Sequence, residues 1–316
     1  MIYRRLGRTG LEVSLLSLGT GGPNQFGQAS GVPESDIHRL VHRALDLGIN
    51  LFDSSPGYGD SELILGRALK GVPRDHYLVS TKMRIDAGMW DDVVTPEAVV
   101  KSVENSLRRL QVSELDVFLV AGWPKPRAYE RIIDELLPVL DRLRQQGRFR
   151  YLGASEASRY DGAHEWLARG LRDDLFDVVM VAYNMINQCA EREVFPLCRK
   201  NDVGTMIIFA VRKLFNRPER LKEVIAALQK RSLIAQGALP VDDPLGWVLG
   251  DGADSLIDAA YKFCAGNEDV STVLTGTNSI DHLQENLGAV SGPPLAEEMV
   301  EQLRFLFQGI AQPIGN

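Results

Sequence analysis

Short apolar runs alternate along the chain with longer amphipathic segments. Eight of the runs are rich in β-branched, aliphatic or aromatic residues and predict buried strands, at residues 15–20, 50–55, 77–82, 115–120, 151–156, 177–182, 204–209 and 272–276. The segments between them have helical spacing of apolar residues, and in the first of these segments Ser35 is a candidate N-cap and Gly48 a candidate C-terminal stop. Near-continuous apolar strands that alternate with helices are typical of a parallel sheet covered on both faces.

Eight such units most simply close into an α/β fold of the (β/α)8 TIM barrel type, although a doubly wound sheet fits the same pattern. No linker rich in Pro, Gly or Ser divides the chain, so we expect residues 1–316 to form a single domain. Two short β-like runs around "GRTG" in residues 1–14 predict an N-terminal β-hairpin. Residues 210–271 separate strands 7 and 8 by far more than a normal connection, which predicts a long loop region at one mouth of the barrel.

Composition and charge narrow the class of protein. The chain is 45% hydrophobic and 24% charged, with a net charge of −7, which is typical of a globular protein and argues against a nucleic-acid partner. It has no long apolar run and no apolar N-terminal segment, so we expect no membrane partner and a cytoplasmic location. Its three cysteines show no CxxC spacing, so neither a disulfide framework nor a metal site is predicted.

In a barrel of this kind, chemistry takes place at the C-terminal ends of the strands. The second predicted strand ends near Asp53, with Tyr58 five residues further on, and the third ends in Lys82. Asp53 would keep Lys82 charged, and Lys82 would stabilise the phenolate of Tyr58, so that Tyr58 could donate a proton to a carbonyl oxygen. A structural ion pair beside a rim aromatic explains the same residues equally well.

Several segments resemble one known family. "GINLFDSSPGYGDSELILGRAL" resembles the signature of the aldo-keto reductase superfamily, and "YRRLGRTGLEVSLLSLGTGG", "SVENSLRRLQVSELDVFLV" and "TGTNSIDHLQENL" resemble its hairpin and first strand, its third helix and fourth strand, and its cofactor-binding final helix. The resemblance implies a (β/α)8 barrel, a nicotinamide cofactor bound without a Rossmann domain, and reversible hydride transfer to a carbonyl. Consistently, the chain contains neither GxGxxG nor GxxxxGK[ST].

The resemblance assigns Asp53, Tyr58 and Lys82 to three of the family's four catalytic positions. The fourth is a histidine after the fourth strand, and in "LDVFLVAGWP" this position holds Ala121. We therefore expect the site to accept a bulkier substrate or to perform a different redox step, with Trp123 or a substrate group filling the space.

The resemblance also implies a set of cofactor contacts: Gly19, Thr20, Ser155, Phe209, Arg212, Gly276, Thr277, His282, Glu285 and Asn286. In this set Ser155 would meet the nicotinamide carboxamide and Phe209 would stack on the ring. Two amide partners usual in the family are replaced, by Glu156 and Met180. Gly276 and His282 also replace the basic pair often found for a 2′-phosphate. Arg212 and Lys213 could supply that charge, which favours NADP(H) slightly over NAD(H).

Three functions remain open from the sequence. The leading hypothesis is an NAD(P)-dependent oxidoreductase that acts on a small carbonyl or alcohol. The second is a cofactor-binding regulatory protein with weak or no catalysis, which the replacements at Ala121, Glu156 and Met180 suggest. The third is a class I aldolase-like lyase with Lys82 as Schiff-base nucleophile. Substrate choice is expected to depend on the loops after Lys82 and within 210–250, where Trp90 and Trp247 lie.

Overall fold

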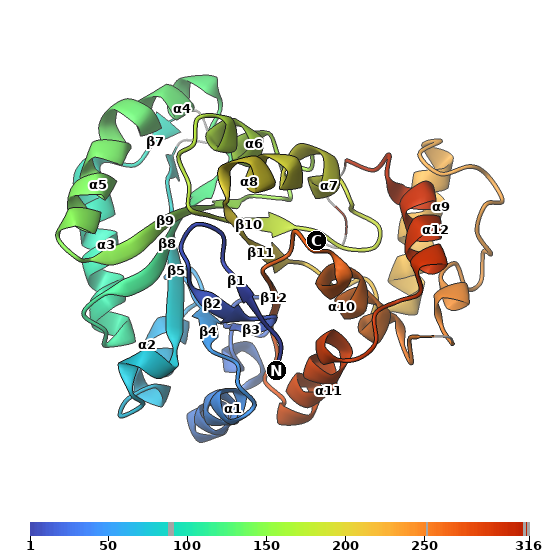
Figure 1. Ribbon diagram of the computed structural model, residues 1–316, viewed down its shortest axis with the longest axis horizontal. Helices are drawn as coiled ribbons and strands as arrows, with labels where there is room; N and C mark the ends of the chain where they lie inside the picture. Colours follow the sequence, from blue (N-terminus) through green and yellow to red (C-terminus); the bar gives the residue numbers. More distant parts are fainter. Residues whose placement is uncertain (88–91, 251, 312–313, 315–316) are drawn as a thin grey trace.

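Eight parallel strands close into a barrel with the helices outside it (Figure 1). The computed structural model describes residues 1–316 apart from 88–91, 251, 312–313 and 315–316. The barrel strands, in their order around it, are β3 (Leu16–Gly19), β4 (Leu51–Asp53), β5 (Leu78–Arg84), β8 (Leu115–Gly122), β9 (Phe149–Glu156), β10 (Val178–Ala182), β11 (Gly204–Ile208) and β12 (Thr272–Thr275). This closure confirms the predicted (β/α)8 barrel and excludes the doubly wound sheet.

Each of the eight predicted apolar runs overlaps one barrel strand, and β5, β8 and β9 extend beyond their runs. Neighbouring strands pair in parallel around the whole barrel, from β3 with β4 to β12 with β3. Because every strand runs in the same direction, all eight C-terminal ends lie at one mouth of the barrel, where the candidate chemistry was expected.

The amphipathic segments form the helices. In chain order these are α1 (Glu34–Asp46), α2 (Ser61–Ala68), α3 (Pro96–Leu110), α4 (Pro126–Arg131), α5 (Leu137–Gln145), α6 (Glu165–Arg172), α7 (Ala190–Glu193), α8 (Phe195–Asn201), α9 (Pro218–Lys230), α10 (Leu256–Gly266), α11 (Ile280–Ser291) and α12 (Glu297–Phe307). Among the described residues, no helix is long and apolar enough to cross a membrane.

The ends of α1 test the two expected helix signals. The prediction that Ser35 caps the helix is wrong: α1 begins at Glu34, directly after Pro33, and Ser35 lies inside its first turn. Proline is well suited to a helix start because the first turn needs no backbone N–H from it. Gly48 ends the helix as expected, in a left-handed conformation with φ of 85°.

The predicted N-terminal hairpin closes the other end of the barrel. β1 (Tyr3–Arg5) pairs antiparallel with β2 (Glu12–Ser14). Leu6, Leu11 and Val13 join the apolar cluster that fills the barrel interior, and the Tyr151 hydroxyl at the start of β9 donates to the Thr9 carbonyl at 2.7 Å. With its N-terminal end plugged, the barrel is left with its C-terminal mouth as the place for a site.

The segment between β11 and β12 is more ordered than the predicted long loop region. It contains α9 and α10, with a short 3-10 helix at Gly246–Val248 between them. The apolar residues Leu221, Ile225 and Leu228 of α9 are buried and follow helical spacing after Pro218, so the sequence did hold the signal for this helix. A second hairpin, β6 (Asp86–Ala87) with β7 (Asp92–Val93), follows β5.

Candidate active site

Side-chain alternation along β8 decides which of its residues face the barrel interior. Val117 and Leu119 belong to the interior cluster, whereas Phe118 and Val120 pack between the strands and the helices. Because side chains on a strand alternate between its faces, Ala121 points into the barrel, one step beyond Leu119. The position assigned to the absent histidine therefore faces the C-terminal mouth.

The same rule brings residues of three other strands to this mouth. Asp53 ends β4 two residues after Leu51, which belongs to the interior cluster. Lys82 of β5 contacts Asp53 directly, and Ser155 of β9 is the register partner of Ala121. The structure thus gathers the polar strand ends that the sequence singled out.

Asp53 and Lys82 form a buried ion pair. Lys82 Nζ donates to the two carboxylate oxygens of Asp53, at 2.9 and 2.7 Å, and to the Ser54 carbonyl at 2.8 Å. The Ser80 hydroxyl donates to the same carboxylate at 2.7 Å. Burial opposes the charge of Lys82, but Asp53 and Tyr58 more than offset this effect, so the pKa of Lys82 is raised. Lys82 is therefore a fixed ammonium at neutral pH.

Tyr58 lies above this ion pair on the loop after β4. Lys82 Nζ is 5.1 Å from the centroid of its ring. The Tyr58 carbonyl accepts hydrogen bonds from Ser61 Oγ at 2.7 Å and from Gln28 Nε2 at 3.1 Å. A Cβ atom on Gly21 would lie 2.6 Å from ring atoms of Tyr58. The loop anchors the tyrosine backbone, and Gly21 leaves room for a half-buried phenol beside a cation.

The surroundings of Ala121 differ from this polar cluster. Its register partners are Arg84 on β5 and Ser155 on β9. Trp123, proposed from the sequence to fill the space, stacks on Tyr160 with ring centroids 6.3 Å apart and an interplanar angle of 6°. Trp123, two residues after the small, half-buried Ala121, thus pairs with an aromatic residue on the loop after β9.

Glu156 faces away from the mouth. Leu152 and Ala154 pack in the layer between strands and helices, so Glu156, two residues further on, points outward with them. Its carboxylate accepts from the Ala182 backbone N–H at 2.7 Å and lies 2.6 Å from Nδ1 of His164. Both side chains of this pair are fully buried, and Met180 belongs to the barrel interior.

The Glu156 carboxylate keeps His164 charged. Burial of the imidazole lowers its pKa, but the charge and hydrogen bond of Glu156 outweigh this effect, so the pKa of His164 is raised. Asp161, whose own pKa is raised by burial, and Glu193 act on His164 in the same direction as Glu156. Glu156 is therefore committed to a buried ion pair that ties β9 to β10 and to the start of α6.

Phe209 and Arg212 lie together on the loop after β11. The Arg212 guanidinium carbon is 3.8 Å from the centroid of the Phe209 ring. Burial lowers the pKa of Arg212, while a charge on Tyr58 would raise it, so Arg212 lies within electrostatic range of the phenol. Asn184 Nδ2 donates to the Phe209 carbonyl at 3.1 Å. This places Arg212 beside the residue expected to stack on nicotinamide.

Gly19 and Thr20, the expected contacts after β3, hold the inner end of the site. The Thr20 hydroxyl donates to Ser54 Oγ at 2.9 Å, and its backbone N–H donates to the Asp53 carbonyl at the same distance. Thr20 is fully buried. Its hydrogen bonds fix the backbone on both sides of the Asp53 carboxylate.

The residues expected to bind the adenosine end surround the start of α11. Gly276 is close to β3, because a Cβ atom on it would lie 3.9 Å from the Gly19 carbonyl. Thr277 Oγ1 accepts from the Ser279 N–H at 3.1 Å, and Ser279 caps the helix by accepting from the His282 N–H at 3.3 Å. The helix begins at Ile280, shortly after β12 ends at Thr275, and His282 is exposed in its first turn.

Glu285 and Asn286 follow on the next turn of α11. Asn286 Nδ2 donates to Thr275 Oγ1 at 2.9 Å, which joins the helix to the last residue of β12. Glu285 is exposed. Of the two tryptophans expected to shape substrate choice, Trp247 donates to the Pro244 carbonyl at 3.2 Å, and Trp90 lies outside the described residues.

Three residues at or behind the site were not singled out from the sequence. Arg84 lies two residues beyond Lys82 on the same inward face of β5 and pairs with Asp86 at 2.6 Å, so alternation alone could have placed it at the mouth. Gly21 gave no comparable signal, because its importance depends on Tyr58, which is distant in sequence. His164 gave none because only the fold of the chain after β9 brings it back to Glu156.

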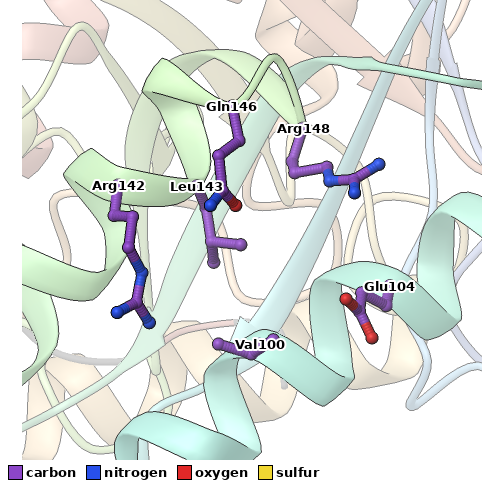
Figure 2. Close-up of a pocket in the computed structure, with 6 residues that line it drawn as sticks. All are labelled: Val100, Glu104, Arg142, Leu143, Gln146 and Arg148. Carbon is purple, nitrogen blue, oxygen red and sulfur yellow. The ribbon is translucent and has the colours of Figure 1, made fainter.

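A surface pocket lies elsewhere, in the outer helix layer (Figure 2). Its lining comes from α3, α5 and the residue just before β9: Val100, Glu104, Arg142, Leu143, Gln146 and Arg148. Arg148 precedes the N-terminal end of β9, whereas the candidate site is at the C-terminal ends of the strands. The pocket contains none of the predicted site residues, and we do not assign the chemistry to it.

Comparison with known proteins finds one family over most of the chain. Residues 16–306 match the aldo/keto reductase family. An NADH-specific methylglyoxal reductase of Escherichia coli is 31% identical over 220 residues, which span 64% of this chain and 65% of that protein, just under two thirds of it. An L-galactose dehydrogenase of Arabidopsis thaliana is 28% identical over 306 residues, covering 91% of this chain and 88% of that protein.

Solved structures share the fold. An aldo-keto reductase from Bacillus halodurans in its holo form superposes with a TM-score of 0.73 over 100% of this chain and 99% of its own, at 24% identity. A putative aldo-keto reductase from Pseudomonas aeruginosa gives a TM-score of 0.64 over 92% and 94% of the two chains, at 26% identity. The barrel is thus common to proteins of this kind.

Proposed function

The chain belongs to the aldo/keto reductase family, and from that premise we propose that it is an NAD(P)-dependent oxidoreductase acting on a carbonyl or alcohol substrate. The observation that carries the proposal is the buried Asp53–Lys82 ion pair beneath Tyr58. A paired ammonium beside a phenol places positive charge next to the oxygen that becomes negative when the phenol gives up its proton, so Tyr58 is suited to proton transfer at the reacting oxygen.

The residues at the mouth fit a nicotinamide cofactor. Phe209 offers an aromatic face, Ser155 a hydroxyl at the end of β9, and Gly276 a position without a side chain before a capped helix N-terminus, a combination suited to an aromatic ring and to phosphate groups. When bound, the cofactor would supply or accept the hydride at the substrate carbon. Asn286, Thr277 and His282 would lie toward its adenosine end.

Tyr58 is the proposed general acid in reduction and the general base in oxidation. Its hydroxyl would deliver a proton to the carbonyl oxygen as that oxygen gains negative charge, and Lys82 would stabilise the resulting phenolate. Asp53 acts through Lys82, because it holds the ammonium in place and charged. Loss of a hydrogen-bond donor to a developing oxyanion costs about 10²- to 10³-fold in rate, so Ala121 predicts a slower or differently selective enzyme.

A cofactor-binding regulatory protein is the alternative that one observation favours. Glu156 turns away from the mouth into its pair with His164, so the nicotinamide end has fewer polar contacts than the family's usual set. The lyase hypothesis has no such support. Lys82 donates to three oxygen atoms and carries a raised pKa, which is the opposite of what a neutral amine nucleophile needs.

The test is titration of the protein with NADPH and with NADH, followed by protein fluorescence, and then turnover on a panel of aldehydes and ketones. Binding with turnover supports the oxidoreductase, binding without turnover supports the regulatory alternative, and no binding of either cofactor contradicts both. The slight preference for NADP(H) stays a prediction. Because Arg212 stacks on Phe209, we expect the adjacent exposed cation Lys213 to serve a 2′-phosphate. The ratio of the two dissociation constants measures the preference.

A further inference from the structure

Arg212 is a half-buried cation at the mouth without an acidic partner. Its guanidinium lies flat against Phe209, 3.8 Å from the ring centroid, and in the part of the chain that the structure describes no carboxylate lies within ion-pair distance of it. The two other cations that point into the mouth are already paired, Lys82 with Asp53 and Arg84 with Asp86. A partly buried guanidinium of this kind is ready to receive an anion.

The backbone that carries Arg212 is held in an uncommon conformation. Phe209 has φ of 65° and Arg212 has φ of 42°. Neither residue is a glycine, and left-handed backbone in other residues is unfavourable and tends to occur where function requires it. The hydrogen bond from Asn184 to the Phe209 carbonyl holds one of the two in place. An energetically unfavourable backbone conformation of the loop thus holds the guanidinium against the Phe209 ring.

We propose that Arg212 binds a carboxylate carried by the substrate, and that the preferred substrates are carbonyl compounds with a carboxylate near the reacting carbon, or the corresponding hydroxy acids. The planar guanidinium presents paired N–H donors that match the two oxygens of a carboxylate. This assignment rests on the proposed oxidoreductase function and names the substrate class of the same site.

Two features favour the substrate over the cofactor as the source of the anion. Arg212 contacts Phe209 and lies in electrostatic range of Tyr58, the two residues that would flank the reacting carbonyl. The phosphate-binding features, a capped helix start with Thr277 and His282, belong to a different loop, after β12.

The experiment compares matched substrates on the full-length protein with NADPH and with NADH. Succinic semialdehyde carries a carboxylate, and butanal has the same chain length without it. Wild type, Arg212→Gln and Arg217→Gln are assayed for kcat/KM on both compounds. Arg217→Gln is the matched control, since it removes an exposed positive charge from the same loop at a residue with no assigned role in binding. Cofactor dissociation constants are measured for each variant by fluorescence.

We expect wild type to prefer succinic semialdehyde. Arg212→Gln should lower kcat/KM for that substrate by about 10- to 100-fold, the usual loss for a charge-assisted hydrogen bond, and leave butanal and the cofactor dissociation constants nearly unchanged. Arg217→Gln should leave kcat/KM for both substrates and the cofactor dissociation constants nearly unchanged. Turnover of butanal by Arg212→Gln also shows that the variant is folded.

Three results would overturn the assignment. An equal loss on both substrates gives Arg212 a supporting role in the loop, and a matching loss of cofactor affinity makes a cofactor phosphate its ligand. Butanal turnover without any preference for succinic semialdehyde in the wild type contradicts the substrate class alone. If the wild type binds cofactor but reduces no compound of the wider carbonyl panel, the proposed function fails and the assignment fails with it.

Discussion

The two sides of the barrel mouth differ in what their strands direct inward. On the β4–β5 side, Asp53 and Lys82 form a buried ion pair under Tyr58. On the β8–β9 side, Ala121 occupies the inward position and the carboxylate of Glu156 is turned outward to His164. One side keeps the polar groups needed to move a proton, and the other offers space.

This difference separates two tasks that a carbonyl-reducing site must perform. Proton transfer needs a tuned acid, which the β4–β5 side supplies. Orientation of the carbonyl and the nicotinamide needs donors and acceptors aimed at them, and the β8–β9 side supplies fewer of these. We expect substitutions on the first side to lower turnover strongly and, at the ion pair, stability as well. Substitutions on the second side should change selectivity, with a smaller loss of stability.

The largest expected effect comes from removing the proton donor. Tyr58→Phe should lower kcat by about 10²- to 10⁴-fold, the range usual for loss of general acid–base catalysis. The half-buried ring stays in place, so cofactor binding and the unfolding transition should be nearly unchanged. Steady-state kinetics with fluorescence titration measure both. A variant that keeps wild-type kcat would show that Tyr58 is only a rim aromatic.

The next effect concerns stability. Lys82→Met leaves the Asp53 carboxylate buried without its partner, so the free energy of unfolding near neutral pH should fall by about 3–5 kcal/mol. Because the pKa of Lys82 is raised in the folded state, its contribution is present below the unfolded lysine pKa of about 10.4 and is lost as pH rises through the folded value.

Urea unfolding of wild type and Lys82→Met between about pH 8 and pH 11 checks this sign. The difference in the free energy of unfolding between wild type and Lys82→Met should become smaller at the alkaline end of this range. The double variant Lys82→Met with Asp53→Asn serves as control and should recover part of the loss, because it removes the unpaired charge. A gap that widens with pH would contradict the ion-pair assignment.

On the β8–β9 side, Glu156→Gln should cost about 1–3 kcal/mol at pH near 6, because His164 loses its charged partner. The pKa of His164 is raised in the folded state, so the contribution is present below its unfolded pKa of about 6.5 and is lost as pH rises through the folded value. Unfolding curves at several pH values should show that the free energies of unfolding of wild type and Glu156→Gln converge at alkaline pH. Equal costs at all pH values would show that the charge on His164 contributes nothing.

The smallest effect tests how Tyr58 is positioned. A methyl group on Gly21 would collide with the Tyr58 ring, so Gly21→Ala should lower kcat by about 10-fold through displacement of the phenol, with little change in stability. Gly57→Ala is the matched control on the tyrosine loop, since its Cβ atom would meet only Ser55 Oγ, at 3.6 Å. Equal kcat for Gly21→Ala and wild type would show that the Tyr58 ring can accommodate the added methyl group without leaving its catalytic position.

The barrel and the β4–β5 side were predictable from sequence because their signals are local. Apolar runs of strand length marked every barrel strand, and Asp53 and Lys82 each end such a run, so topology alone brought them together. The helix α9 was not predicted, because residues 210–271 were interpreted from the length of the segment and not from its apolar spacing. Ser35 was mistaken for a cap because Pro33 fixes the start of α1.

The β8–β9 side was less predictable because its contacts depend on backbone geometry that residue types and spacing do not reveal. Whether Glu156 faces the mouth depends on strand register and on its meeting His164, and the sequence shows neither. The same holds for Arg212, expected at the adenosine end and found stacked on Phe209. A left-handed φ at both residues turns the loop in a direction that no residue type there signals.

The most direct test of the two-sided account is Ala121→His, made alone and together with Tyr58→Phe, and assayed for kcat/KM on small aldehydes. If Ala121 faces the reacting oxygen, the added imidazole should raise the rate by up to about 10²-fold, and only while Tyr58 is present to donate the proton. Activity indifferent to Ala121→His in the wild-type background would show that Ala121 does not line the reacting centre and would contradict the account.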